Sequence, residues 1–229
     1  MRNRSDLETC EIDMRRAKVL SRGIVVAAVT TLVLSTTSCG EVARTGRSPV
    51  MLVIESLEGA SGAEPDAFSS VLFSDVETIV EAQVGGQTVR IPTIYGDTGR
   101  AGLRLVLKNP GSATSPLGPS ALNEVTVTRY RVTFRRADGR STPGVDVPHA
   151  FDGAVTVTIP ASGSAAAVFS VVRHQAKMEP PLSGLQRGGA ANMISTIAEV
   201  TFYGRDQAGN DVAVTGLLSV NFGDFGDPS

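Results

Sequence analysis

Residues 211–222 alternate between one apolar face and one mostly polar face. A period of two is typical of a β-strand with one buried face, because successive side chains of a strand point to opposite sides. Residues 198–203 alternate in the same way. Between the two segments, Gly209 and Asn210 tolerate the positive φ of a tight turn. The pattern therefore predicts an antiparallel β-hairpin.

The segment 123–137 changes its parity along its length. Its apolar residues stand first on odd and then on even positions: Val125 and Val127, followed by Tyr130, Val132 and Phe134. A straight strand cannot bury both sets on one face. We therefore expect a bulge near residues 128–129, or a strand that crosses between two sheets.

Turn residues separate nine segments with strand-like patterns: 49–57, 71–79, 88–94, 101–108, 123–137, 154–159, 165–173, 196–205 and 211–222. Helical periodicity is weak, and only residues 189–197 are a candidate for a short helical turn. Many short strands predict an all-β fold, an antiparallel β-sandwich of about 7–9 strands that spans residues 49–223 as one domain. Residues 224–229 are predicted to be a flexible tail.

An apolar run at residues 24–34 has the features of a secretory signal peptide, which is predicted to cover residues 1–38. The run is shorter than the roughly 20 residues that a membrane-spanning helix needs. Basic residues precede it and small polar residues follow it, as in a signal peptide. The acidic residues before Met14 are unusual for such a signal, and they indicate that Met14 is the true start.

Cys39 directly follows the small residues 35–38. This arrangement resembles the lipobox of bacterial lipoproteins, except that Thr36 stands where leucine is usual. The resemblance implies that Cys39 is diacylated through its sulfur, becomes the mature N-terminus and begins a lipidated tether at residues 39–48. Such an anchor would hold the protein on the extracytoplasmic side of a membrane in the bacterial cell envelope. Two alternatives stay open: ordinary cleavage after Ser38, which leaves a free thiol, and a retained anchor.

A second resemblance lies in residues 202–212, which contain the turn Asp206-Gln207-Ala208-Gly209-Asn210. The turn is similar to the D-x-A-G-N turn that joins the last two strands of bacterial immunoglobulin-like domains. The resemblance implies an immunoglobulin-like β-sandwich, and it concerns turn geometry rather than chemistry. The cysteine pair and tryptophan of antibody domains are absent, so an antibody-type core is excluded.

Charge and motifs exclude several classes of function. A formal net charge of −2 argues against a nucleic-acid-binding protein, which needs a basic excess. Cys10 precedes the predicted cleavage site, so the mature chain keeps Cys39 alone and has no intramolecular disulfide. The sequence has no H-E-x-x-H, G-x-S-x-G or phosphate-loop motif. His149 is interpreted as a solvated loop residue and His174 as a solvated residue at the end of a strand. We therefore expect no cofactor, no metal site and no enzymatic activity.

Arg129, Arg131 and Arg135 share one face of the strand predicted at residues 123–137. This stripe is a candidate face for an anionic ligand, such as an anionic glycan, a lipid headgroup or an acidic strand of a partner. The alternative is an exposed face whose charges keep the protein soluble and prevent an edge strand from pairing with another chain.

Together, these patterns predict a lipid-anchored extracytoplasmic β-sandwich with a non-enzymatic role in binding, adhesion or scaffolding, and with an envelope protein as its partner. The first alternative is a carbohydrate- or ligand-binding accessory module, although an aromatic content of 5% without tryptophan counts against strong stacking on sugars. The second alternative is a hydrolase whose catalytic triad no motif reveals.

Overall fold

The predicted all-β fold is confirmed by the computed structural model, which describes residues 48–187 and 192–225. Most of the regular structure in these residues is strand, and the helices are short. Met14, Cys39, the predicted signal peptide and most of the predicted tether lie outside the described residues. So do residues 226–229 of the predicted tail.

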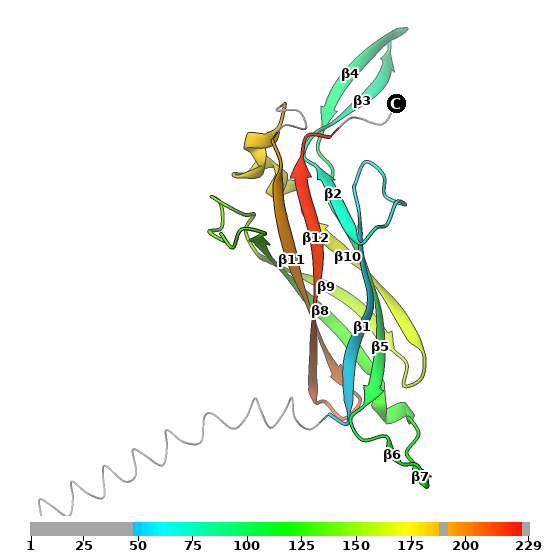
Figure 1. The fold of residues 1–229 in the computed structure, drawn as a ribbon. Coiled ribbons are helices and arrows are strands. Elements are labelled where there is room, and N and C mark those ends of the chain that lie inside the picture. Colours follow the sequence, from blue (N-terminus) through cyan, green and yellow to red (C-terminus); the bar gives the residue numbers. More distant parts are fainter. Residues whose placement is uncertain (1–47, 188–191, 226–229) are drawn as a thin grey trace, which may run out of the picture. The chain divides into compact units, whose positions relative to one another are not determined.

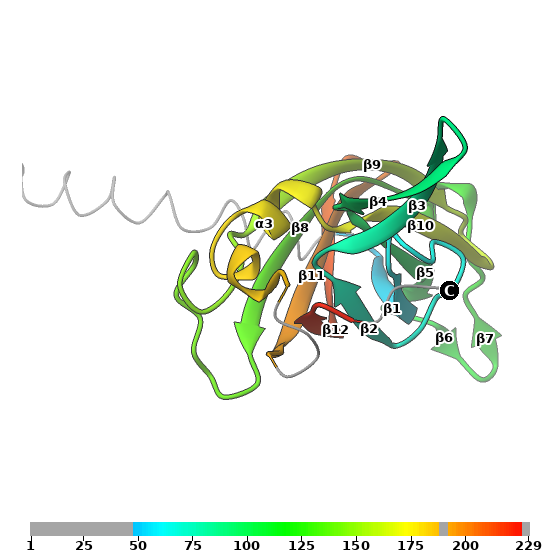
Figure 2. The same ribbon diagram turned by 90° about the horizontal axis from the view of Figure 1, so that it is seen from above.

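Two sheets form the body of the described domain (Figure 1). Sheet A has the strand order β1-β5-β10, with β1 at Val50–Ala60, β5 at Asp97–Leu107 and β10 at Ser164–Val172. Sheet B has the order β2-β12-β11-β8-β9, and its strands are β2 Val71–Asp75, β12 Asp211–Gly223, β11 Ile194–Asp206, β8 Val125–Arg136 and β9 Phe151–Ile159. Seen from above, β1 and β5 lie on one side of the domain and β8 and β11 on the other (Figure 2).

The direction of β2 departs from a purely antiparallel sandwich. All other neighbouring strands of the two sheets are antiparallel, but β2 runs parallel to β12, with Val71 opposite Ser219 and Asp75 opposite Gly223. Although β1 and β2 follow each other in the chain, they lie at the edges of different sheets. The chain therefore crosses from sheet A to sheet B through residues 61–70.

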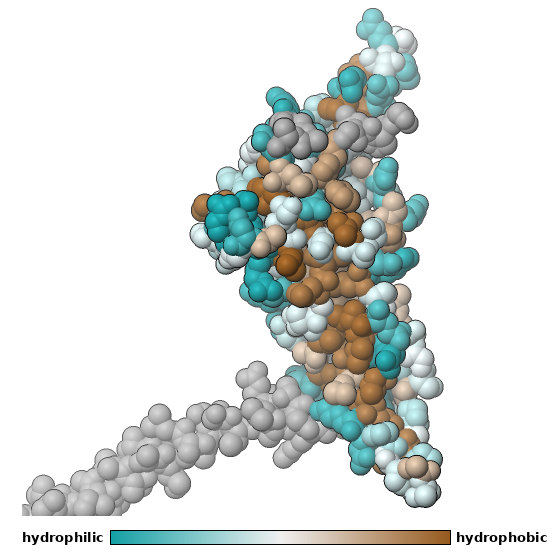
Figure 3. Space-filling model, in the orientation of Figure 1, coloured by the Kyte–Doolittle hydropathy of each residue, from teal (hydrophilic) through white to brown (hydrophobic). Residues whose placement is uncertain are grey.

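Side chains from both sheets share one core. Tyr130 of β8 packs against Phe169 of β10 with ring centroids 5.0 Å apart, and Phe169 meets Phe202 of β11 at 5.2 Å. At another point of the core, a Cβ added at Gly216 of β12 would lie 2.7 Å from the Cδ1 atom of Ile54, so β1 and β12 pack closely there. Figure 3 shows apolar side chains gathered along this side of the domain, over β1 and β12.

The predicted bulge in β8 is confirmed, and it lies at Thr128. Against β11, the register of β8 passes from Val127 directly to Arg129 while Gly204 and Tyr203 follow each other, so Thr128 is the extra residue. The register against β9 is also irregular at this point. Val127 before the bulge and Tyr130 after it are both buried. The extra residue reverses the alternation, and this lets both apolar sets face the same core.

The bounds of several predicted elements were wrong. The segment predicted as one strand at 71–79 contains β2 and the start of β3, Thr78–Val84, which forms a separate two-stranded ribbon with β4, Gln87–Thr93. Residues 194–197 belong to β11 and not to a helical turn. The helices are instead α3, His174–Met178, and η2, Leu182–Leu185, in a region predicted as strand end and loop. The shorter elements are β6 Gly111–Ser112, β7 Ser115–Pro116 and η1 Ala121–Asn123.

The predicted hairpin of β11 and β12 is confirmed, and its turn tests the need for glycine. Gly209 has a φ of 83°, and nothing lies within 4 Å of a Cβ added there. Gly209→Val is therefore expected to lower the free energy of unfolding by about 1–2 kcal/mol through backbone strain and without a clash. Urea denaturation measures this, with Gly118→Val as the control, because Gly118 also has open space but no positive φ. Equal effects of the two substitutions would contradict the explanation.

Candidate functional site

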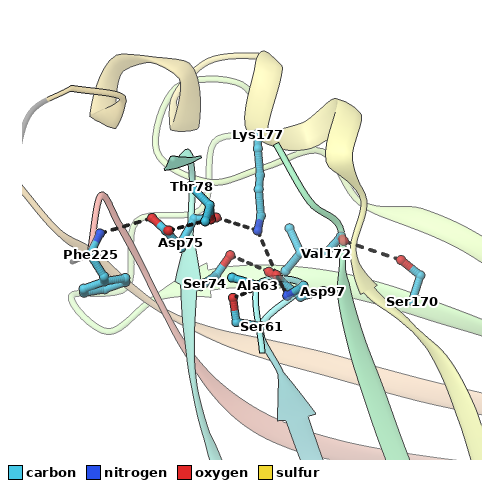
Figure 4. Close-up of polar contacts among 11 residues, drawn as sticks. Ser61, Ala63, Ser74, Asp75, Thr78, Asp97, Ser170, Val172, Lys177 and Phe225 are labelled. Carbon is cyan, nitrogen blue, oxygen red and sulfur yellow. Dashed lines mark hydrogen bonds and ion pairs between the residues drawn. The ribbon is translucent and has the colours of Figure 1, made fainter. Parts of the chain in front are cut away.

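A completely buried ion pair lies at one end of the described domain (Figure 4). The Nζ of Lys177 is 2.8 Å from Oδ1 of Asp97, and neither side chain is accessible to solvent. Charged side chains are rarely buried unless they are paired, because burial removes them from water. The pair is therefore the most unusual polar arrangement among the described residues.

Strand pairing brings the two residues of this ion pair together. Asp97 is the first residue of β5, and it lies opposite Val172, the last residue of β10. The chain turns into α3 directly after β10, so Lys177 comes over the end of β5. Figure 4 shows the Lys177 side chain pointing from the helix down to Asp97.

Both oxygens of the Asp97 carboxylate accept hydrogen bonds. Oδ1 accepts from Nζ of Lys177 at 2.8 Å and from the backbone N–H of Gly62 at 3.0 Å. Oδ2 accepts from Oγ of Ser74 at 2.5 Å. Burial raises the pKa of Asp97, and the nearby Lys177 ammonium opposes this change. The carboxyl group therefore holds its proton more tightly than an exposed aspartate does.

Asp75 connects the ion pair to the end of β12. Its backbone oxygen accepts a hydrogen bond from Lys177 Nζ at 2.7 Å. Its carboxylate accepts from Oγ1 of Thr78 at 2.8 Å and from the backbone N–H of Phe225 at 3.1 Å. The Phe225 ring also meets Phe73 edge-on, with centroids 5.5 Å apart. The first residues of the predicted tail therefore pack against the domain.

The arginine stripe predicted from the sequence lies on the outer face of sheet B, where acidic side chains pair with it. Arg129 and Arg131 both contact Asp152 of β9, at 3.4 Å and 2.8 Å. Arg135 contacts Glu199 of β11 at 2.5 Å. The three guanidinium groups are about half exposed, and they face two carboxylates. This arrangement fits the alternative of a charged soluble face, and the anionic ligand stays a prediction.

The remaining candidate residues are spread over the domain. His149 and His174 are both exposed, and His174 is the first residue of α3. In the part of the chain that the structure describes, no group of three or more His, Cys, Asp or Glu side chains could hold a metal ion. Asp206 closes the β11–β12 turn, because its carboxylate accepts hydrogen bonds from the backbone and side chain of Asn210.

None of the described helices is both long and apolar enough to cross a membrane.

Comparison with known proteins finds no match. No family model, no curated protein and no solved structure matches this chain. What the chain does must therefore be inferred from its own residues.

One surface was not predicted from the sequence. The ribbon of β3 and β4 pairs only with itself among the described strands, and it has one apolar and one polar face. The apolar face carries Val80, Ala82, Val84, Val89 and Ile91, with Gln87 opposite Val84 at its end. Val84 is 60% exposed, Val89 41% and Ile91 43%. On the polar face, Glu81 contacts Arg90 at 3.9 Å, and Gln83 donates a hydrogen bond to Thr88. We call this element the amphipathic ribbon.

Proposed function

We propose that this chain is a lipid-anchored, non-enzymatic binding protein on the extracytoplasmic side of the bacterial cell envelope. Its body is an immunoglobulin-like sandwich, and the amphipathic ribbon is its binding element. The single observation that carries the binding role is the half-exposed apolar face of this ribbon. A two-stranded ribbon is only marginally stable in water unless its apolar face packs against something.

The order of the strands supports the immunoglobulin-like assignment. In such sandwiches, the first, second and fifth strands share one sheet, while the third, sixth and seventh share the other with added edge strands. Here, β1, β5 and β10 form sheet A, and β8, β11 and β12 form sheet B with β9 at its edge. Tyr130 on β8 packs against Phe202, and it occupies the kind of core position where antibody domains have a tryptophan.

The position of the ribbon supports a partner that lies away from the anchor. Ser48, at the start of the described domain, hydrogen-bonds to Asp206 beside the β11–β12 turn. The ribbon begins just after Val76, whose N–H bonds to the oxygen of Gly223 at the other end of β12. A 13-residue strand is about 40 Å long. A lipid anchor that joins the domain at Ser48 would therefore leave the ribbon at the far end (Figure 1).

The anchor is tested by replacing Cys39. Cys39→Ser is expected to move nearly all of the protein out of the membrane pellet, or to stall its maturation, because serine cannot form the thioether. Fractionation of cells followed by immunoblotting measures this distribution. Cys10→Ser, upstream of the predicted cleavage site, should leave the distribution unchanged. A Cys39→Ser protein that matures normally and stays in the pellet would rule out the anchor.

The ribbon is tested by two neighbouring substitutions on its opposite faces. Val89→Lys puts a charge on the apolar face, and Thr88→Lys puts the same charge on the polar face. We expect Val89→Lys to reduce the recovery of cross-linked envelope protein at least tenfold, because a charge in an apolar contact has no partner. Thr88→Lys should retain recovery. Equal recovery of envelope protein with both variants, at matched melting temperatures, would exclude the ribbon as the binding element.

A further inference from the structure

We propose that Lys177 and Asp97 are a modification site, at which the lysine amine and the aspartate carboxyl condense into an intramolecular amide bond. Nζ is already 2.8 Å from Oδ1, inside a site that excludes water. The inference concerns the body of the domain, and it does not depend on the proposed anchor or ribbon.

The surroundings hold both reacting groups in position. Gly62 and Ser74 fix the carboxylate by hydrogen bonds to Oδ1 and Oδ2. The backbone oxygen of Asp75 accepts a second hydrogen bond from Nζ at 2.7 Å, which limits the orientation of the amine. A well-oriented intramolecular pair reacts as if its partner were present at about 10⁵–10⁸ M. Holding the two groups in contact therefore lowers the barrier to their condensation.

The reaction balances without another reactant. One proton passes from the Nζ ammonium to Oδ1, and the freed electron pair of Nζ attacks Cγ. The bond between Nζ and Cγ forms, the bond between Cγ and Oδ1 breaks, and Oδ1 leaves as water with a second proton from Nζ. Oδ2 becomes the amide oxygen and keeps its hydrogen bond from Ser74. The remaining N–H can still donate to the backbone oxygen of Asp75.

Burial favours the product over the ion pair. The raised pKa of Asp97 favours the neutral acid, which is the form that can lose water. Condensation also removes two buried charges, each of which is costly in a medium of low dielectric constant. Because both side chains are inaccessible to solvent, water cannot readily reverse the step. The bond would join the start of β5 to α3, across 80 residues of chain.

A tryptic peptide map of the full-length chain, purified in detergent and denatured before digestion, tests the proposal. We expect a branched product that contains residues 91–100 and 174–187 and is lighter by one water than the two peptides together. Trypsin should not cleave after Lys177, because the amide has no charge. Recovery of linear 91–100 together with free 174–177 and 178–187, and an intact mass without loss of water, would overturn the proposal.

Two lysine substitutions control the assignment. Lys177→Arg keeps the positive charge but cannot form this amide, so the branched product and the mass loss should both disappear. Lys108→Arg changes an exposed lysine, and it should leave both signals intact. A loss of water that persists in Lys177→Arg would assign the mass change to another site. The peptide map of the protein without substitutions shows whether the amide bond is present, even if Lys177→Arg does not fold.

Discussion

Lys177→Met is expected to lower the free energy of unfolding by about 3–5 kcal/mol, because removal of one partner of a buried ion pair leaves the other charge uncompensated. Asp97 would keep only the hydrogen bonds from Gly62 and Ser74. Urea denaturation followed by circular dichroism measures the loss. If Lys177 and Asp97 form an amide bond, the loss of stability would be larger, because the substitution would also open the loop of chain that this bond closes.

Matched variants separate the buried charge from the loss of packing. Lys108→Met removes an exposed lysine, and it should change stability by no more than about 0.5 kcal/mol. Adding Asp97→Asn to Lys177→Met should recover part of the loss, because the amide keeps polar atoms for Gly62 and Ser74 but carries no charge. A double variant that is less stable than Lys177→Met alone would contradict the explanation.

The sign of the pH dependence follows from the raised pKa of Asp97. A carboxyl group with a raised pKa in the folded state stabilises the fold at low pH, and this contribution is lost as the pH rises through that pKa. In Lys177→Met, acid should therefore protonate the unpaired carboxyl and remove its charge. The difference in melting temperature between Lys177→Met and Lys108→Met should become smaller as the pH is lowered. If this difference in melting temperature grew toward low pH, a group other than Asp97 would control the pH dependence.

Tyr130→Ala is expected to cost about 3–5 kcal/mol, because truncation of a buried aromatic residue leaves a cavity. The Tyr130 ring lies among Phe151, Phe169 and Phe202, and so it joins the two sheets. Its hydroxyl oxygen accepts a hydrogen bond from the backbone N–H of Ser170 at 3.2 Å. Both the ring and the hydroxyl therefore contribute, and two substitutions separate them.

Tyr130→Phe is the matched control, because it removes the hydroxyl and keeps the ring. We expect it to cost about 1 kcal/mol, the usual effect of one lost hydrogen bond. Chemical denaturation of both variants gives the comparison. If Tyr130→Phe costs as much as Tyr130→Ala, the bond to Ser170 and not ring packing would hold the sheets together at this point.

The hairpin and the bulge could be predicted from the sequence because both depend on neighbouring residues. Alternation along β11 and β12 defines their buried faces, and Gly209 supplies the turn. The change of parity between Val127 and Tyr130 required an extra residue, and Thr128 is that residue. A period of two is a local property of the backbone, so it can be recognised without knowledge of the partner strand.

The arginine stripe shows where such local inference stops. The shared face of Arg129 and Arg131 follows from the parity of β8. Their acidic partner, Asp152, belongs to β9 and meets them only through the register of two strands. The amphipathic ribbon was missed for a related reason: residues 71–79 look continuous in the sequence, but the chain leaves sheet B after Asp75 and begins a new strand at Thr78.

By itself, the sequence determined that this domain is built of strands, where the closing hairpin turns and where β8 must bulge, because alternation and glycine conformations act within a few residues. Only the tertiary structure decided which strands share a sheet and that β2 runs parallel to β12. It also decided that Lys177 meets Asp97, 80 residues earlier in the chain. The physical reason is that a charged residue in a polar segment is normally solvated, and only packing of distant elements over it can remove the water.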